Sequence, residues 1–164
     1  MTDGIRRRRL LGSIGAIATA GAVAGCSTDT GGDGGDGGDG GGGDGATPSW
    51  PSYLDDATVQ GSEDATGESE VTVAVGPQGA LLFEPTKLVV DAGTTVHFEF
   101  ESPGHNVKPN SQPDGGSLDG TSGGEMELMD KGETYTVTLD TPGTYTYYCA
   151  PHEGTGMKGG IQVK

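Results

Sequence analysis

The last sixteen residues of the chain bring together three types of metal-binding side chain. Within nine residues they present a thiol, Cys149, an imidazole, His152, and a thioether, Met157. A second imidazole, His105, lies upstream in the sequence Pro-Gly-His-Asn-Val. Two histidines, one cysteine and a weak axial methionine are the ligand set of a blue-copper electron-transfer site. The residues therefore predict one bound copper ion and a chain that carries electrons without transforming a substrate.

These residues fit copper better than zinc, and they fit an electron carrier better than a copper enzyme. Structural zinc prefers sets of cysteine and histidine, so Met157 at this spacing argues against zinc. Met126 and Met129 are alternative thioethers, which we interpret as apolar side chains of a connecting segment. A copper oxidase or nitrite reductase would need further histidine-rich centres, and the chain has three histidines in all. A copper chaperone is the alternative function, although such proteins usually expose several Met or Cys donors.

Short strands separated by turns would position the ligands. Apolar and polar side chains alternate in four segments, residues 71–75, 94–101, 135–139 and 145–149. No segment of useful length has helical periodicity, so we expect an all-β antiparallel sandwich with Greek-key connections. Cys149 shares a strand face with Tyr145 and Tyr147, which predicts a sulfur that points into the core. A buried thiolate is costly unless a cation such as a metal ion compensates it.

The loops at the strand ends suit a compact metal site. His105 follows the turn Ser102-Pro-Gly104, which would end one strand and deliver its imidazole from a neighbouring strand. Pro151 would stiffen the Cys-His-Met loop, whose glycines let the chain wrap tightly around an ion. His97 falls on the outward face of its strand, so we expect an exposed residue there and not a ligand. The strands within residues 108–130 are not assigned.

The N-terminal 25 residues have the features of a signal peptide. Arg6–Arg9 and the following Leu10-Leu11 resemble a twin-arginine signal, and an uncharged run of small and apolar residues follows. The sequence Ala22-Val-Ala-Gly-Cys26 resembles a lipobox, in which Cys26 would become the lipid-bearing N-terminus. Plain cleavage, which would leave Cys26 as a free thiol, is the alternative. We expect an exported protein at the extracytoplasmic face of the cell membrane, anchored to the lipid through Cys26.

Residues 26–49 predict a flexible tether between this anchor and a folded domain at residues 50–164. Gly31–Gly45 contains only Gly and Asp. Such a segment cannot bury apolar surface and is expected to be disordered. A Gly-rich linker of this length spans roughly 20 Å as a root-mean-square distance.

The charge of the chain limits its partners. The formal net charge is −15, and all four arginines lie in Arg6–Arg9. The chain has no basic footprint for nucleic acid. Strong acidity favours a soluble monomer. Because the acidic residues are spread along the chain, we interpret them as the surface of a halophilic protein, and an acidic docking patch for one partner is the alternative.

The domain resembles the plastocyanin-like type 1 copper proteins, and most of all the halocyanins of haloarchaea. The resemblance covers about residues 50–164 and is strongest at residues 83–96, 104–107 and 132–164. It implies an eight-stranded Greek-key sandwich and one-electron transfer between membrane-bound donor and acceptor proteins. The family's ligand motifs correspond to His105, Cys149, His152 and Met157.

The resemblance also implies roles for residues around the copper. Asn106 corresponds to an asparagine that steadies the cysteine loop by hydrogen bonding. In this family the second histidine reaches the surface through an apolar patch, so His152 is the expected electron port, with Pro151 and Leu81 or Leu82 nearby. Tyr148 would be either a second exit for the electron or an exposed strand aromatic.

Overall fold

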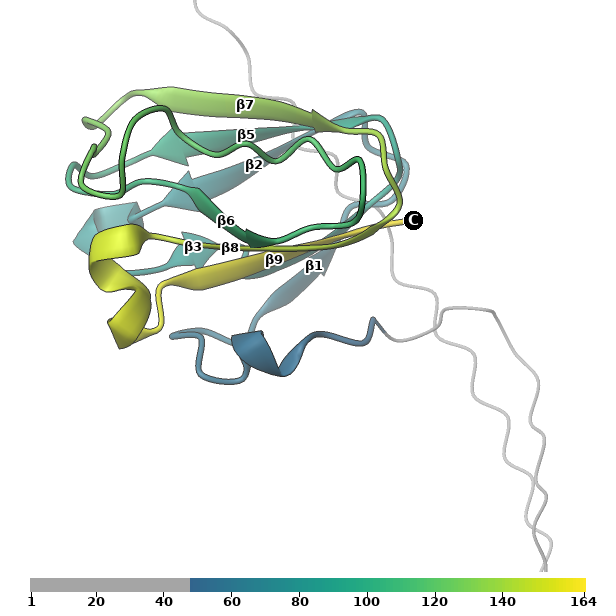
Figure 1. Cartoon of the computed structure of the whole chain (residues 1–164), viewed down its shortest axis with the longest axis horizontal. Helices are drawn as coiled ribbons and strands as arrows, with labels where there is room; N and C mark the ends of the chain where they lie inside the picture. Colours follow the sequence, from purple (N-terminus) through teal and green to yellow (C-terminus); the bar gives the residue numbers. More distant parts are fainter. Residues whose placement is uncertain (1–47) are drawn as a thin grey trace, which may run out of the picture. The chain divides into compact units, whose positions relative to one another are not determined.

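The computed structural model describes residues 48–164, and its strands form two facing sheets (Figure 1). The strand order is β1-β4-β9-β8-β6 in one sheet and β3-β2-β5-β7 in the other. The strands are β1 (Ser62–Asp64), β2 (Glu70–Val75), β3 (Phe83–Glu84), β4 (Lys87–Val90), β5 (Thr94–Phe100), β6 (Lys108–Ser111), β7 (Thr134–Leu139), β8 (Gly143–Tyr148) and β9 (Lys158–Val163). Three short 3-10 helices accompany them, η1 (Ser52–Leu54), η2 (Pro77–Gly79) and η3 (Ala150–Thr155). The predicted signal peptide, Cys26 and most of the predicted tether lie outside the described residues.

The predicted all-β Greek-key sandwich is confirmed, but its strands are not all antiparallel. The pairs β1/β4, β4/β9 and β2/β5 run parallel. The chain crosses to the other sheet at β4 between β2 and β5, so β5 returns beside β2 in the same direction. Alternation of apolar and polar residues shows which face a strand buries, and it carries no information on the direction of the neighbouring strand.

An aromatic cluster fills the space between the sheets and fixes the end of β8. Tyr145 and Tyr147 are fully buried, as predicted for the face they share with Cys149. The ring of Tyr147 meets Phe98 edge to face, with centroids 5.1 Å apart, and Phe83 at 4.9 Å. Such pairs contribute about 0.5–1.5 kcal/mol each beyond their buried area. Because Tyr147 lies two residues before Cys149, this packing holds the strand end from which the cysteine projects.

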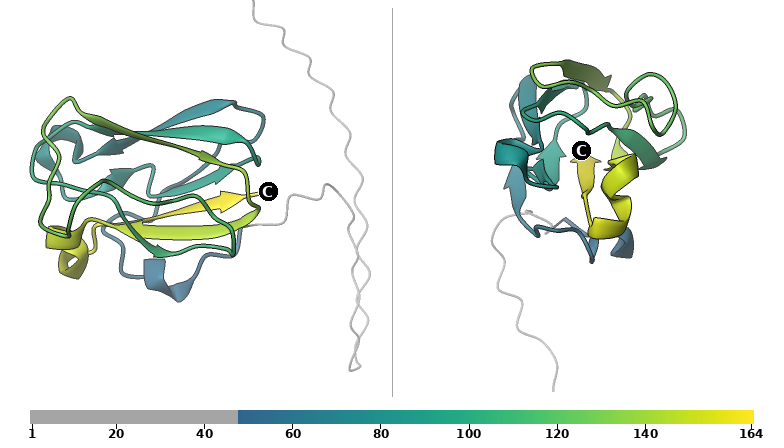
Figure 2. Two further views of the ribbon diagram at one scale, coloured as in Figure 1. Left: turned by 45° about the horizontal axis from the view of Figure 1, so that its top comes forward. Right: turned by 90° about the vertical axis from the view of Figure 1, so that its left-hand side faces the viewer.

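The loops of one end of the sandwich gather around the C-terminal end of β8. Helices η2 and η3 both lie at this end, as the view along the sandwich shows (Figure 2). Residues 108–130, left unassigned from the sequence, form β6 and then a long loop. The buried Leu118 anchors this loop, and an isolated bridge joins its end at Met129 to His105.

His97 lies on the outer face of β5, where Nδ1 is 3.1 Å from the Thr136 hydroxyl. Among the described residues no helix has the length and apolar character needed to cross a membrane.

Candidate metal centre

Three of the predicted ligands converge at the end of the sandwich. His105 lies in the connection between β5 and β6, Cys149 directly follows β8, and His152 belongs to η3. Their donor atoms all lie within 4.8 Å of one another. Sγ of Cys149 is 3.6 Å from Nδ1 of His105 and 3.4 Å from Nδ1 of His152. The two imidazole rings are tilted by 52°, with centroids 4.9 Å apart. Cys149 and His152 are neighbours in one loop, whereas His105 is 44 residues from Cys149, so the fold brings the first histidine to the other two donors.

The geometry of the cluster fits a single metal ion. A metal bonded to imidazole nitrogen and thiolate sulfur at about 2.0–2.3 Å brings its donors to roughly 3.5–4 Å of one another in a trigonal arrangement. The two sulfur–nitrogen distances, 3.6 and 3.4 Å, are close to that spacing. A thiolate with two imidazoles is a donor set that suits copper. The two sulfur–nitrogen distances therefore suit a copper ion held by these three side chains.

Burial sets the protonation of the donors. Cys149 is fully buried, and desolvation raises the pKa of its thiol, although the backbone N–H groups of Asn106 and His152 act in the opposite direction. Burial also lowers the pKa of His105, and the charge of His152 lowers it further. At neutral pH the metal-free site therefore offers a neutral His105 imidazole and a protonated Cys149 thiol. A bound cation would favour the thiolate.

Asn106 connects the two loops that carry the donors. Its Oδ1 accepts a hydrogen bond of 2.8 Å from the backbone N–H of Ala150, the residue after Cys149. Its Nδ2 donates to the backbone carbonyls of Glu125 at 2.7 Å and Glu127 at 3.2 Å. The side chain is fully buried, and the carboxamide meets partners on both sides. Asn106 therefore ties the His105 segment to the start of the cysteine loop.

The loop from Cys149 to Met157 closes on itself. The backbone N–H of Cys149 donates to the carbonyl of Met157 at 3.1 Å, and the N–H of Met157 donates to the carbonyl of His152 at 3.2 Å. Pro151 is the second residue of the 3-10 helix η3, and Gly156 caps its C-terminal end with φ of +87°, a conformation that favours glycine. Met157 is fully buried at the end of this loop. The loop thus confines all three of its predicted ligands within one short turn.

Gly76 packs directly against His105, a contact that the sequence did not reveal. A Cβ atom at this glycine would lie 2.6 Å from Nε2 of His105, and the residue has φ of +67°. The Ser102 hydroxyl donates to the Gly76 carbonyl at 2.6 Å and fixes this approach. The only sequence signal was a glycine before Pro77, which is too common to identify a contact.

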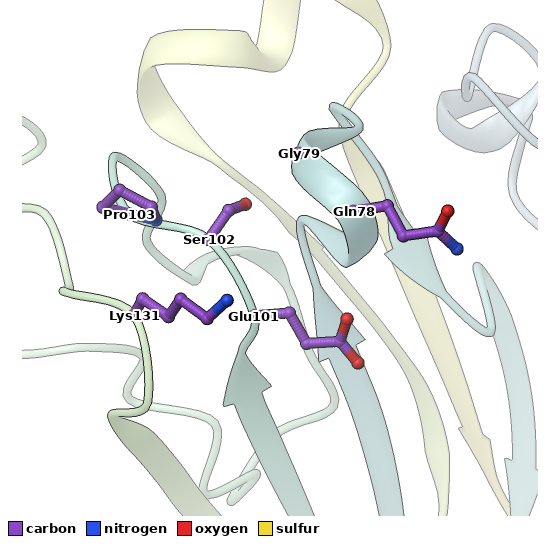
Figure 3. A pocket seen from close by; sticks show the side chains of 6 residues that line it. All are labelled: Gln78, Gly79, Glu101, Ser102, Pro103 and Lys131. Atoms are coloured by element: carbon purple, nitrogen blue, oxygen red, sulfur yellow. The ribbon is translucent and has the colours of Figure 1, made fainter.

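A surface hollow near this end of the sandwich does not contain the donors. It has a volume of about 490 Å³ and is lined by Gln78, Gly79, Glu101, Ser102, Pro103 and Lys131 (Figure 3). Ser102 links it to the site through its contact with Gly76, but none of the lining residues is a predicted ligand. The hollow therefore borders the metal centre without forming part of it.

Comparison with known proteins identifies the family of the chain. The family described as copper binding proteins, plastocyanin/azurin family, matches residues 69–164, a range that includes all four predicted ligands. A plastocyanin from Scenedesmus fuscus is 41% identical over 100 residues, which cover 58% of this chain and all of the relative. A plastocyanin from Prochlorothrix hollandica is 44% identical over 86 residues, 52% of this chain and 65% of the relative. A solved structure of a mutant fern plastocyanin is 35% identical and covers 57% of this chain and all of its own, with a TM-score of 0.48.

We predict that Asn106→Ala destabilises the metal-free protein. The change leaves the Ala150 N–H and two backbone carbonyls without their buried partner, which costs about 1–3 kcal/mol in the free energy of unfolding. Denaturant unfolding measures this loss. Asn110→Ala is the matched control, because the exposed Asn110 side chain makes a single hydrogen bond within residues 48–164, to the Thr146 hydroxyl. Equal losses in the two variants would contradict the linking role of Asn106.

Proposed function

Because the chain belongs to the copper-binding plastocyanin/azurin family, we propose that it is a blue-copper protein that carries single electrons between redox partners. Proteins of this family are electron carriers and not enzymes, and copper is their cofactor. The observation that carries the proposal is the convergence of Cys149, His105 and His152 within 4.8 Å. In this proposal these three residues would hold the copper, and the thioether of Met157 would be its fourth and weakest ligand.

The copper supplies a one-electron couple, and the residues of the chain keep its surroundings constant. The Asn106 link and the closed loop restrain Cys149 and His152 from both sides. A site that keeps the same donors in both oxidation states needs little rearrangement when an electron arrives or leaves. Burial of Cys149 and Met157 excludes water from that side of the site.

We propose His152 as the electron port. Its side chain is partly exposed, whereas His105 is buried with 3% of its surface exposed. Among the residues expected nearby, Pro151 and Leu81 are exposed. Tyr148 is a second candidate exit, since it is adjacent to Cys149 in sequence and partly exposed. Burial raises the pKa of Tyr148, and the nearby carboxylates of Glu125 and Glu153 raise it further, so the phenol stays neutral at physiological pH.

The N-terminal sequence supports a carrier held at a membrane. We propose that the chain is a halocyanin-type protein, exported through a twin-arginine signal at residues 1–25 and attached by lipid at Cys26. A Gly/Asp tether at residues 26–49 would then let the copper domain at residues 50–164 move between membrane-bound donor and acceptor proteins. The acidic composition is consistent with a halophilic, monomeric protein.

We predict an intense visible absorption band for the copper-loaded chain, together with an EPR spectrum of a type 1 site. Cys149→Ser is expected to abolish the band, because the colour of such sites comes from the thiolate bound to copper. Cys26→Ser is the matched control and should keep it. A band that survives loss of Cys149 would refute the ligand assignment. A protein that holds only colourless Cu(I), without reversible reduction at an electrode, would instead indicate a copper chaperone.

We predict that copper uptake becomes weaker as the pH falls. Because burial raises the pKa of Cys149, the thiol is protonated at neutral pH and must lose its proton when copper binds. The apparent affinity should fall by roughly tenfold for each unit of pH below the raised thiol pKa. Competition against a copper chelator of known affinity measures this slope. An affinity that is constant between pH 6 and 8 (about two decades of proton concentration) would contradict thiolate ligation.

A further inference from the structure

A segment outside the family match lies against the loop that carries the proposed copper ligands. Residues 50–58, which we call the strap, precede the matched range of residues 69–164. They include η1, which runs beside β9, and they continue to the turn at the end of η3 (Figures 1 and 2). The strap thus lies outside the range that matches the family model, and it packs against the loop from Cys149 to Met157.

The end of the strap is hydrogen-bonded to the turn between His152 and Met157. The backbone N–H of Thr58 donates to the Gly156 carbonyl at 2.9 Å. The Thr58 hydroxyl donates to the Thr155 carbonyl at 3.1 Å. These two carbonyls belong to the residues directly before Met157, so the strap holds the backbone that leads into the proposed axial ligand.

Side chains of the strap contact the ligand loop beside His152 and directly after Met157. The Tyr53 hydroxyl donates to the Glu153 carboxylate at 2.9 Å, next to His152 in sequence. Asp56 forms an ion pair of 2.8 Å with Lys158, the residue after Met157. The Lys158 ammonium also lies 4.5 Å from the centre of the Tyr53 ring, a cation–π contact. The lysine side chain is 10% exposed and the Asp56 side chain is 71% exposed, so the ion pair lies at the surface and the lysine stem is covered.

The strap packs closely against the end of the ligand loop and against β9. A Cβ atom on Gly156 would lie 2.5 Å from the Asp56 carbonyl, and one on Gly160 would lie 2.6 Å from a methyl group of Leu54. Leu54 is fully buried. Gly156 at the end of the loop therefore faces the strap backbone, and Gly160 in β9 faces the apolar anchor of the strap, so displacement of the strap would open a gap in the packing.

We propose that the strap is a positioning element that fixes the conformation of the ligand loop and thereby the placement of His152 and Met157. Tyr53, Asp56 and Thr58 act through Glu153, Lys158 and Thr155, residues that flank the two proposed ligands. The strap touches none of the donor atoms that cluster in the structure, so its effect on copper is transmitted through the loop backbone. The role of the strap in copper placement rests on the proposed function, whereas its restraint of the loop does not.

The test uses the full chain with the substitutions Tyr53→Phe, Asp56→Asn and Thr58→Val combined, which remove two hydroxyl hydrogen bonds and the charge of the ion pair with Lys158 and keep the shape of each residue. Asp55→Asn is the matched control, because it makes the same charge change on the neighbouring residue, whose carboxylate has no ion pair or hydrogen bond among residues 48–164. In the metal-free protein, amide hydrogen exchange at Gly156 and Met157 should accelerate by about tenfold or more in the triple variant, while amides of β5 keep their rates. Equal acceleration in β5, or none at the loop, would overturn the proposal, since the strap would then be a general stabiliser or inert.

The copper-loaded proteins provide the second measurement. The triple variant should differ from the wild type in reduction potential and in the copper hyperfine splitting of its EPR spectrum, and Asp55→Asn should match the wild type. Unchanged spectra and potential would overturn the role of the strap in ligand placement. If the wild-type chain fails to form a blue-copper site at all, the proposed function is wrong, and hydrogen exchange alone then decides whether the strap restrains the loop.

Discussion

The hydrogen bond between the Asn106 carboxamide and the Ala150 N–H joins two parts of the chain on which the donor cluster depends. One part brings His105 from the end of β5, and the other begins at Cys149 after β8. If these two parts could move independently, the distance between the Cys149 sulfur and the His105 imidazole would not be fixed. Because the carboxamide also binds two carbonyls of the long loop, its orientation is determined before any metal arrives. The fold therefore positions the donors, and Cys149 would have to lose its thiol proton for a metal to bind.

Two further constraints act on the same small region. The aromatic packing around Tyr147 fixes the strand end behind Cys149, and the strap at residues 50–58 holds the outside of the ligand loop. The first is a feature of the sandwich core, and the second lies outside the range that matches the plastocyanin/azurin family. The loop is thus restrained from the core, from the His105 segment and from the surface. Such restraint is what a carrier needs if its donors are to stay in place as the charge changes.

The sequence was informative where local pattern determines the outcome. The phase of the strand at residues 145–149 predicted an inward Cys149, which is fully buried, and the alternation in β5 predicted His97 on the outer face. The sequence also named His105 and His152, which the structure brings beside the sulfur. It could not predict the parallel pairs of strands, because alternation is the same in either direction. Nor could it predict the contact of Tyr53 with Glu153, which are 100 residues apart. Such contacts arise from the path of the chain and leave no local signal.

The central claim is that Cys149, His105 and His152 hold one copper ion in a site that the protein has already shaped. X-ray absorption at the copper edge tests it most directly, with spectra of the loaded chain recorded before and after reduction. We expect one short sulfur and two nitrogen neighbours in both oxidation states, with nearly unchanged distances. Loss of the sulfur neighbour, or a change in the number of nitrogen neighbours on reduction, would contradict the account.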